Sequence, residues 1–173
     1  MSAARNGITV MTFNIRGASA EEWDGVNGWP NRAGLNASTI KRYAPDLIGF
    51  QELQTGNLET YRAELPEYRY VSGPKYTDRE PFMYPSVFWK ASRFELVDSG
   101  GFWLSLTPDR FSRDWGTAYV RSVTWAKLRD TQTGFGLSHW NTHLDNVSQV
   151  ARLEGARLVV QEIRRIRTGD APV

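Results

Sequence analysis

Glu52 is the first candidate for chemistry, because it follows an apolar run, Leu47–Phe50, that predicts a buried strand. A carboxylate is rarely buried without a partner, so Glu52 is expected to meet solvent, a cation or a ligand. In open α/β sheets, ligands lie beyond the carboxyl ends of the strands. The alternative is that Glu52 only marks the end of its strand.

Asn14 and His143 stand at the ends of two further predicted strands, Ile8–Ile15 and Phe135–His143. Asn141 lies two positions before His143, so both side chains project to the same side of a regular strand. A neutral His beside a carboxylate can act as a general acid or base near neutral pH. The alternative is a polar strand end that hydrogen bonds with its own loop.

The composition restricts the metal chemistry that these residues could support. The sequence contains no Cys, which excludes disulfides, thiolate metal sites and cysteine nucleophiles. A metal site would therefore use carboxylate, carbonyl, Asn or His ligands, which favours Mg²⁺, Mn²⁺ or Ca²⁺. Of the two His, His139 falls in the middle of its strand with no neighbouring carboxylate, so we expect it to be structural.

Length and charge indicate the class of protein. The chain has 173 residues, of which 40% are hydrophobic and 23% charged, as expected for one globular domain. The net charge of +2 is too small to demand a polyanionic partner. No run approaches the ~18 apolar residues of a membrane span, and Met1–Gly7 lacks the apolar core of a signal peptide. We expect a cytoplasmic protein, or a secreted one if a leader was removed; no protein partner is evident.

Three elements must position these side chains. The strand Ile8–Ile15, the helix Arg32–Tyr43 and the strand Pro45–Glu52 form a βαβ-like opening. Leu35, Ile40 and Tyr43 are the expected inward residues of the helix.

The rest of the chain favours antiparallel pairing, which indicates a mixed α/β sandwich over a purely parallel sheet. A short helix is expected over Asn57–Glu64. Gly100–Gly101 is expected to interrupt the strand structure before Phe102–Ser105. The expected strands are Tyr68–Ser72, Tyr84–Lys90, Arg93–Val97, Tyr119–Leu128 and Phe135–His143. The last helix, Val147–Arg167, has an apolar stripe formed by Val150, Leu153, Ala156, Val160, Ile163 and Ile166.

Short motifs in a fixed order resemble the endonuclease/exonuclease/phosphatase superfamily, which includes deoxyribonucleases, sphingomyelinases and inositol-phosphate phosphatases. Trp29-Pro30-Asn31-Arg32 fits the family's Trp-x-x-Arg entry to the first helix. The other motifs are Thr12–Arg16, Pro45–Glu52, Phe102–Ser105, Arg121 with Thr124–Ala126, and Asn141–Asp145. The similarity runs from about Ile8 to the end of the sequence.

The resemblance implies a four-layer α/β sandwich of two packed mixed sheets flanked by helices, with a phosphoesterase site at one end. Glu52 would be the ligand of Mg²⁺ (or Mn²⁺), and Asn14 would lie beside that metal or bind the scissile phosphate. His143 would be a catalytic residue that donates a hydrogen bond to the phosphate. Arg121 would contact a phosphate oxygen as a catalytic and substrate-binding residue, and Asn141 would also bind substrate.

Two departures from the family pattern bear on activity. The family usually carries a second glutamate seven residues before the basic residue that closes the aromatic strand; counted from Lys90, that position holds Met83, and Glu80 lies nearby. The later family motifs, Gly-Asp-x-Asn and Ser-Asp-His, are absent from the sequence. We therefore interpret residues 1–173 as the N-terminal portion of one incomplete domain.

The sequence favours a metal-dependent phosphoesterase that is inactive as this fragment alone and active in a full-length parent. Its substrate would be a phosphate ester, with nucleic acid among the candidates. The alternatives are a catalytically inert binding or scaffold module that keeps the fold, and a plain α/β domain with polar strand ends.

Overall fold

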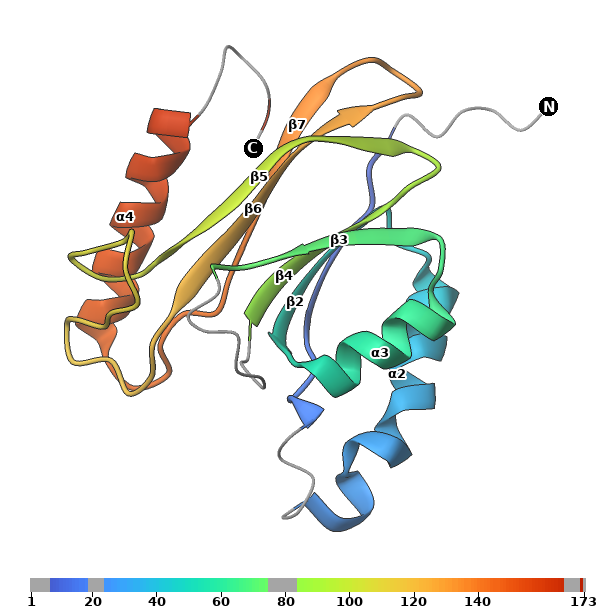
Figure 1. Cartoon of the computed structure of the whole chain (residues 1–173), viewed down its shortest axis with the longest axis horizontal. Coiled ribbons are helices and arrows are strands. Elements are labelled where there is room, and N and C mark those ends of the chain that lie inside the picture. Colours follow the sequence, from blue (N-terminus) through green and yellow to red (C-terminus); the bar gives the residue numbers. More distant parts are fainter. Residues whose placement is uncertain (1–6, 19–23, 75–83, 167–171, 173) are drawn as a thin grey trace.

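Two β-sheets pack face to face, with helices on the outer side of each (Figure 1). The computed structural model describes residues 7–18, 24–74, 84–166 and 172. Apolar clusters fill the spaces between the layers. Phe50 packs with Ile40 and Tyr61 of the first helices, Leu47, Val87 and Phe94 pack between the sheets, and Trp125 belongs to the cluster against which Leu158 of the last helix packs. The predicted α/β sandwich is confirmed.

The first sheet has the strand order β1-β2-β4-β3. Its strands are β1 (Val10–Asn14), β2 (Leu47–Leu53), β3 (Tyr68–Ser72) and β4 (Tyr84–Lys90). β1 and β2 are parallel and are joined by helix α2 (Trp29–Tyr43), after a short 3-10 helix η2 (Gly25–Asn27). Helix α3 (Thr55–Glu64) follows β2. The βαβ-like opening is therefore confirmed.

The second sheet is an antiparallel meander of β5 (Phe94–Trp103), β6 (Ser122–Asp130) and β7 (Gly136–Thr142). The expected break at Gly100–Gly101 is wrong, because β5 continues through both glycines. Gly100 is paired with Trp125, and a Cβ there would lie 2.6 Å from the indole ring. This glycine makes room for a cross-strand tryptophan and does not end the strand.

Helix α2 begins three residues earlier than expected, at Trp29, with a proline at the start that suits a first turn. Ile40 is fully buried, as predicted, but Leu35 and Tyr43 are 70% and 63% exposed, so their predicted inward positions are wrong. Trp29 and Ala37 take the inner face together with Ile40.

The predicted apolar stripe of the last helix, α4 (Gln149–Ile166), is only partly buried: Ile166 packs against the core. Val150 and Leu153 are more than half exposed. The buried residues are Ala151 and Gly155, whose small size lets the helix approach the second sheet. Periodicity could not distinguish the stripe with Val150 and Leu153 from the neighbouring stripe with Ala151 and Gly155, because apolar residues recur at helical spacing on both. None of the helices in the described part of the chain combines the length and apolar character of a membrane span.

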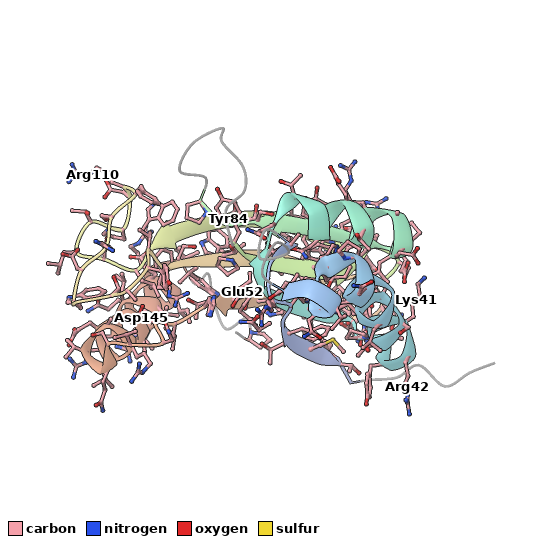
Figure 2. The ribbon with its side chains drawn as sticks, turned by 90° about the horizontal axis from the view of Figure 1, so that it is seen from below. Lys41, Arg42, Glu52, Tyr84, Arg110 and Asp145 are labelled. Carbon is pink, nitrogen blue, oxygen red and sulfur yellow. The ribbon has the colours of Figure 1, made fainter. Side chains whose placement is uncertain are left out.

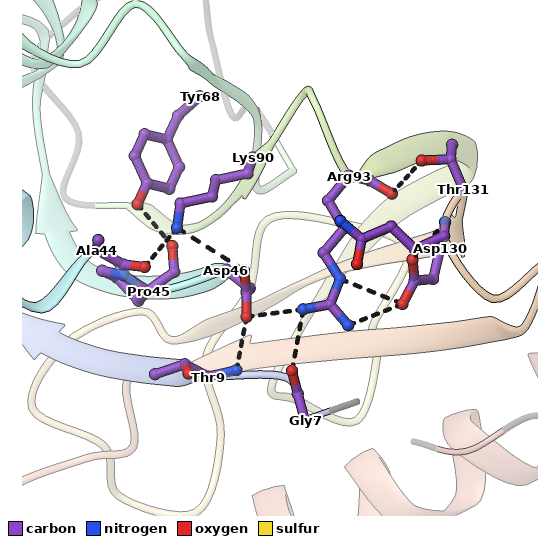
Figure 3. A network of polar contacts seen from close by, with 11 residues as sticks. Gly7, Thr9, Ala44, Pro45, Asp46, Tyr68, Lys90, Arg93, Asp130 and Thr131 are labelled. Atoms are coloured by element: carbon purple, nitrogen blue, oxygen red, sulfur yellow. Dashed lines mark hydrogen bonds and ion pairs between the residues drawn. The ribbon is translucent and has the colours of Figure 1, made fainter. Parts of the chain in front are cut away.

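A buried arginine joins the two sheets at one end of the sandwich (Figure 3). Arg93 donates to Asp130 Oδ2 through Nε (3.2 Å) and Nη2 (3.0 Å), and to Asp46 Oδ2 through Nη1 (3.1 Å). Nη1 also donates to the carbonyl of Gly7 (3.0 Å). Burial raises the pKa of Asp130, but hydrogen bonds from Arg93 and from the Gln132 backbone outweigh it, and the net pKa is lowered.

We expect Arg93→Met to destabilise the protein by about 3–5 kcal/mol, because it leaves the buried carboxylate of Asp130 without its cation. Urea unfolding measures the loss. The matched control is Arg129→Met, which removes an ion pair to Glu95 whose side chains are 60% and 55% exposed; its expected cost is below about 1 kcal/mol. Equal losses in the two variants would contradict a special role for Arg93.

Candidate functional site

The site rests on a hydrogen-bonded pair of buried amides that joins the two sheets. Gln51 Nε2 on β2 donates to Asn141 Oδ1 on β7 at 2.8 Å. Asn141 Nδ2 donates in turn to the carbonyls of Phe50 (2.7 Å) and Ser86 (2.9 Å). A Cβ at Gly49 would lie 2.8 Å from Asn141 Oδ1, so a side chain there would disturb the contact. The structure thus places Asn141 beneath the site, and its contact with substrate stays a prediction.

Glu52 follows Gln51 at a break in the strand pairing. The register between β2 and β4 shifts between Phe50 and Leu53, and Glu52 has a φ of +68°. A non-glycine residue in this region costs roughly 1–2 kcal/mol, and such strain is concentrated at functional sites. Gln51 and Leu53 are buried, while the Glu52 side chain is 20% exposed. The irregular backbone turns this carboxylate out of the buried strand.

Asn14 and the start of the following loop hold the Glu52 carboxylate. Asn14 Nδ2 donates to Oε1 at 2.8 Å, and the Gly17 backbone N–H donates to Oε2 at 3.3 Å. The Asn14 amide oxygen accepts from the Arg16 backbone N–H at 3.0 Å. Asn14 therefore lies beside Glu52, as expected, but it orients the carboxylate through its nitrogen. Its side-chain amide would have to turn before its oxygen could bind a metal held by Glu52.

His143 meets Glu52 from the other sheet. Its Nε2 lies 3.9 Å from Glu52 Oε1, and the two side chains are 25% and 20% exposed. Glu52 lies near the middle of this end of the molecule, between the helices of the first sheet and the side that carries Asp145 (Figure 2). Burial lowers the pKa of His143, and the neighbouring Arg121 lowers it further against the opposing effect of Glu52. The neutral form of the imidazole is therefore favoured where it faces the carboxylate.

Arg121 lies behind His143. Its Nη1 is 3.2 Å from His143 Nδ1, its Nη2 donates to Asn146 Oδ1 at 3.0 Å, and its Nε is 3.5 Å from Asp145 Oδ2. The guanidinium carbon lies 5.5 Å from the ring centre of Tyr119, and the Arg121 side chain is 10% exposed. The three guanidinium nitrogens of Arg121 all face protein groups. Its contact with a phosphate oxygen stays a prediction.

Asp145 was not singled out from the sequence, yet it organises the loop around Arg121. Its carboxylate accepts backbone N–H groups of Ala118 (3.1 Å), Val147 (2.9 Å) and Ser148 (2.8 Å). Burial raises its pKa, but these hydrogen bonds and Arg121 lower it, and the net pKa is lowered. The sequence did contain a signal for this turn. Asp145 stands two residues before Val147 and three before Ser148, which is the spacing of an Asx turn.

The donor set fits one kind of metal site. Within the described ranges, no three His, Cys, Asp or Glu side chains come together as a metal cluster. Mg²⁺ is usually bound by one or two carboxylates and completed by water and substrate phosphates, so Glu52 alone suits it. A Ca²⁺ cage built from several protein oxygens does not fit. Met83 and Glu80 lie outside the described residues.

Similar proteins have been found among solved structures. The endonuclease/exonuclease/phosphatase from Bacteroides vulgatus is 32% identical with a TM-score of 0.85, covering 92% of this chain and 60% of its own. The mannosyl-6-phosphatase of Bacteroides thetaiotaomicron is 28% identical with a TM-score of 0.87, covering 95% and 61%. TDP2 from D. rerio in complex with a single-strand DNA product shares the fold, at 19% identity and a TM-score of 0.68.

Among curated proteins, an uncharacterized protein of Acanthamoeba polyphaga mimivirus is 29% identical over 115 residues, which are 63% of this chain and 42% of that protein. No protein-family model matches the chain. The chain spans about 60% of the length of the similar Bacteroides structures. The predicted resemblance is confirmed: the chain has the fold of endonuclease/exonuclease/phosphatase proteins.

The strained backbone at Glu52 predicts that Glu52→Gly is more stable than Glu52→Ala by about 1 kcal/mol, since glycine accepts a positive φ without a Cβ clash. Both variants lose the same carboxylate contacts, so their difference reports the backbone. Urea unfolding measures both. In the control pair at exposed Glu59 in helix α3, Gly should be the less stable by about 1 kcal/mol. An alanine at position 52 that is as stable as glycine would refute the strain.

Proposed function

From the fold and sequence shared with these phosphatases and nucleases, we propose that the protein is a metal-dependent phosphoesterase that uses Mg²⁺ or Mn²⁺. The observation that carries the proposal is the approach of Glu52 Oε1 and His143 Nε2 to 3.9 Å, from two different sheets. A carboxylate for a divalent cation and an imidazole for a phosphate oxygen are the two groups that such a site needs side by side.

Each side chain takes a separate task in this proposal. Glu52 holds the cation, which when bound polarises the phosphoryl oxygen and offsets charge in the transition state. Asn14 keeps the carboxylate oriented, and its exposed side chain lies where the scissile phosphate would approach. His143 donates a hydrogen bond to a phosphoryl oxygen. The hydrogen bond between the Gln51 and Asn141 side chains holds the strand that carries Glu52 against the strand that leads to His143.

In-line hydrolysis also needs an activated water molecule. We assign no residue of this chain to that task. We therefore expect the 173 residues to bind the cation and a phosphate ester with little turnover of their own.

A small phosphate ester, such as a sugar phosphate, is the proposed substrate class. One similar protein of 28% identity is a mannosyl-6-phosphatase, whereas the DNA-bound TDP2 supports the proposal by its fold alone. Helix α4 carries Arg152, Arg157, Arg164 and Arg165, which form a basic face. This face is partly neutralised, because Arg157 pairs with Glu154 and Arg165 pairs with Glu162. This mixed charge favours a small anion over a long polyanion on that face.

Magnesium should stabilise the protein through Glu52. A cation that binds only the native state raises stability by about 2.7 kcal/mol at a free concentration of about 100 times its Kd. Thermal unfolding with and without Mg²⁺ measures the rise. Glu52→Gln should abolish it, while Glu59→Gln, which removes the same charge from the surface of α3, should leave it intact.

A rise in melting temperature that persists in Glu52→Gln would place the cation elsewhere. No rise in the unaltered protein would favour an inert binding or scaffold module that keeps the fold.

A further inference from the structure

The two nitrogens of the His143 ring face groups of opposite charge. Nδ1 lies 3.2 Å from Nη1 of Arg121, while Nε2 points to the side of Glu52, 3.9 Å from Oε1. Arg121 favours a lone pair on Nδ1, and Glu52 favours a proton on Nε2. Both contacts therefore favour the same tautomer of a neutral imidazole.

A guanidinium can only donate, because all of its nitrogens carry hydrogen and none has a free lone pair. Nδ1 of His143 must therefore accept the hydrogen bond from Arg121, and the ring proton must reside on Nε2. A ring turned by 180° about χ2 would place Cδ2–H against the guanidinium and lose this hydrogen bond.

Arg121 is itself held in place from three directions. Nη2 donates to Asn146 Oδ1, Nε lies 3.5 Å from Asp145 Oδ2, and the Tyr119 ring covers the guanidinium. The Asp145 side chain is fully buried and is fixed by three backbone N–H groups. The donor that faces His143 is therefore fixed before any ligand arrives.

We propose that Arg121 is a positioning residue that holds His143 as the Nε2–H tautomer, with that N–H directed to the Glu52 side of the site. The role given to His143 rests on the proposed function, but the tautomer itself does not. An Nε2–H group donates to a phosphoryl oxygen and cannot take a proton from water at that nitrogen. His143 then acts as a neutral hydrogen-bond donor, and not as a general base.

Nitrogen-15 NMR of the whole chain without divalent cations tests the proposal. The sequence has two His, so a His139→Gln variant assigns the ring signals. Nε2 of His143 should show the shift of a protonated nitrogen and couplings to both ring C–H protons. A scalar coupling between Arg121 Nη1 and His143 Nδ1 should report the hydrogen bond. A protonated Nδ1 in the unaltered protein would overturn the proposal.

Arg121→Met removes the donor but keeps a side chain of similar length. The separation between the two ring-nitrogen shifts is greatest for a single tautomer, so it should shrink in this variant. Asn146→Ala, which removes another partner of Arg121, should keep the full separation, and Arg121→Lys should restore part of it. An unchanged separation in Arg121→Met would overturn the proposal. If Arg121→Met does not fold, the coupling in the unaltered protein still decides. Because no metal is added, a failure of magnesium binding leaves this result intact.

Discussion

The hydrogen bond between the Gln51 and Asn141 side chains fixes how the two sheets face each other near the site. Both amides are buried, so breaking the pair would leave Asn141 Oδ1 without its hydrogen-bond donor, at about 1–3 kcal/mol. Glu52 comes one residue after Gln51, and His143 two residues after Asn141. The carboxylate and the imidazole therefore meet because this hydrogen bond, with those from Asn141 to the carbonyls of Phe50 and Ser86, sets the distance between the strands that carry them.

The sequence predicted the polar residues at the strand ends to within one or two positions: β1 ends at Asn14, Glu52 is the next-to-last residue of β2, and His143 directly follows β7. It could not predict the positive φ of Glu52, since that backbone conformation depends on the pairing of β2 with β4. The Asx turn at Asp145 had a local signal, but the contacts of Asp145 with Ala118 and Arg121 depend on a distant loop, which no local pattern records.

Helix faces were the weakest part of the sequence prediction, for a physical reason. In α2 and α4, apolar residues lie on more than one face, and the buried face is chosen by fit. Ala37 and Gly155 are buried because they are small, while Leu35 and Leu153 remain exposed although they are more apolar. Periodicity counts apolar residues but does not measure how closely a helix must approach its sheet.

In the proposed function, Glu52 and His143 share one cation site. Paramagnetic broadening by Mn²⁺ tests this claim most directly, because the effect falls steeply with distance from the metal. At substoichiometric Mn²⁺, the ring-proton signals of His143 should broaden more strongly than those of His139, and Glu52→Gln should abolish the selective effect. Signals of His143 that stay sharp, or that broaden equally in Glu52→Gln, would contradict the claim.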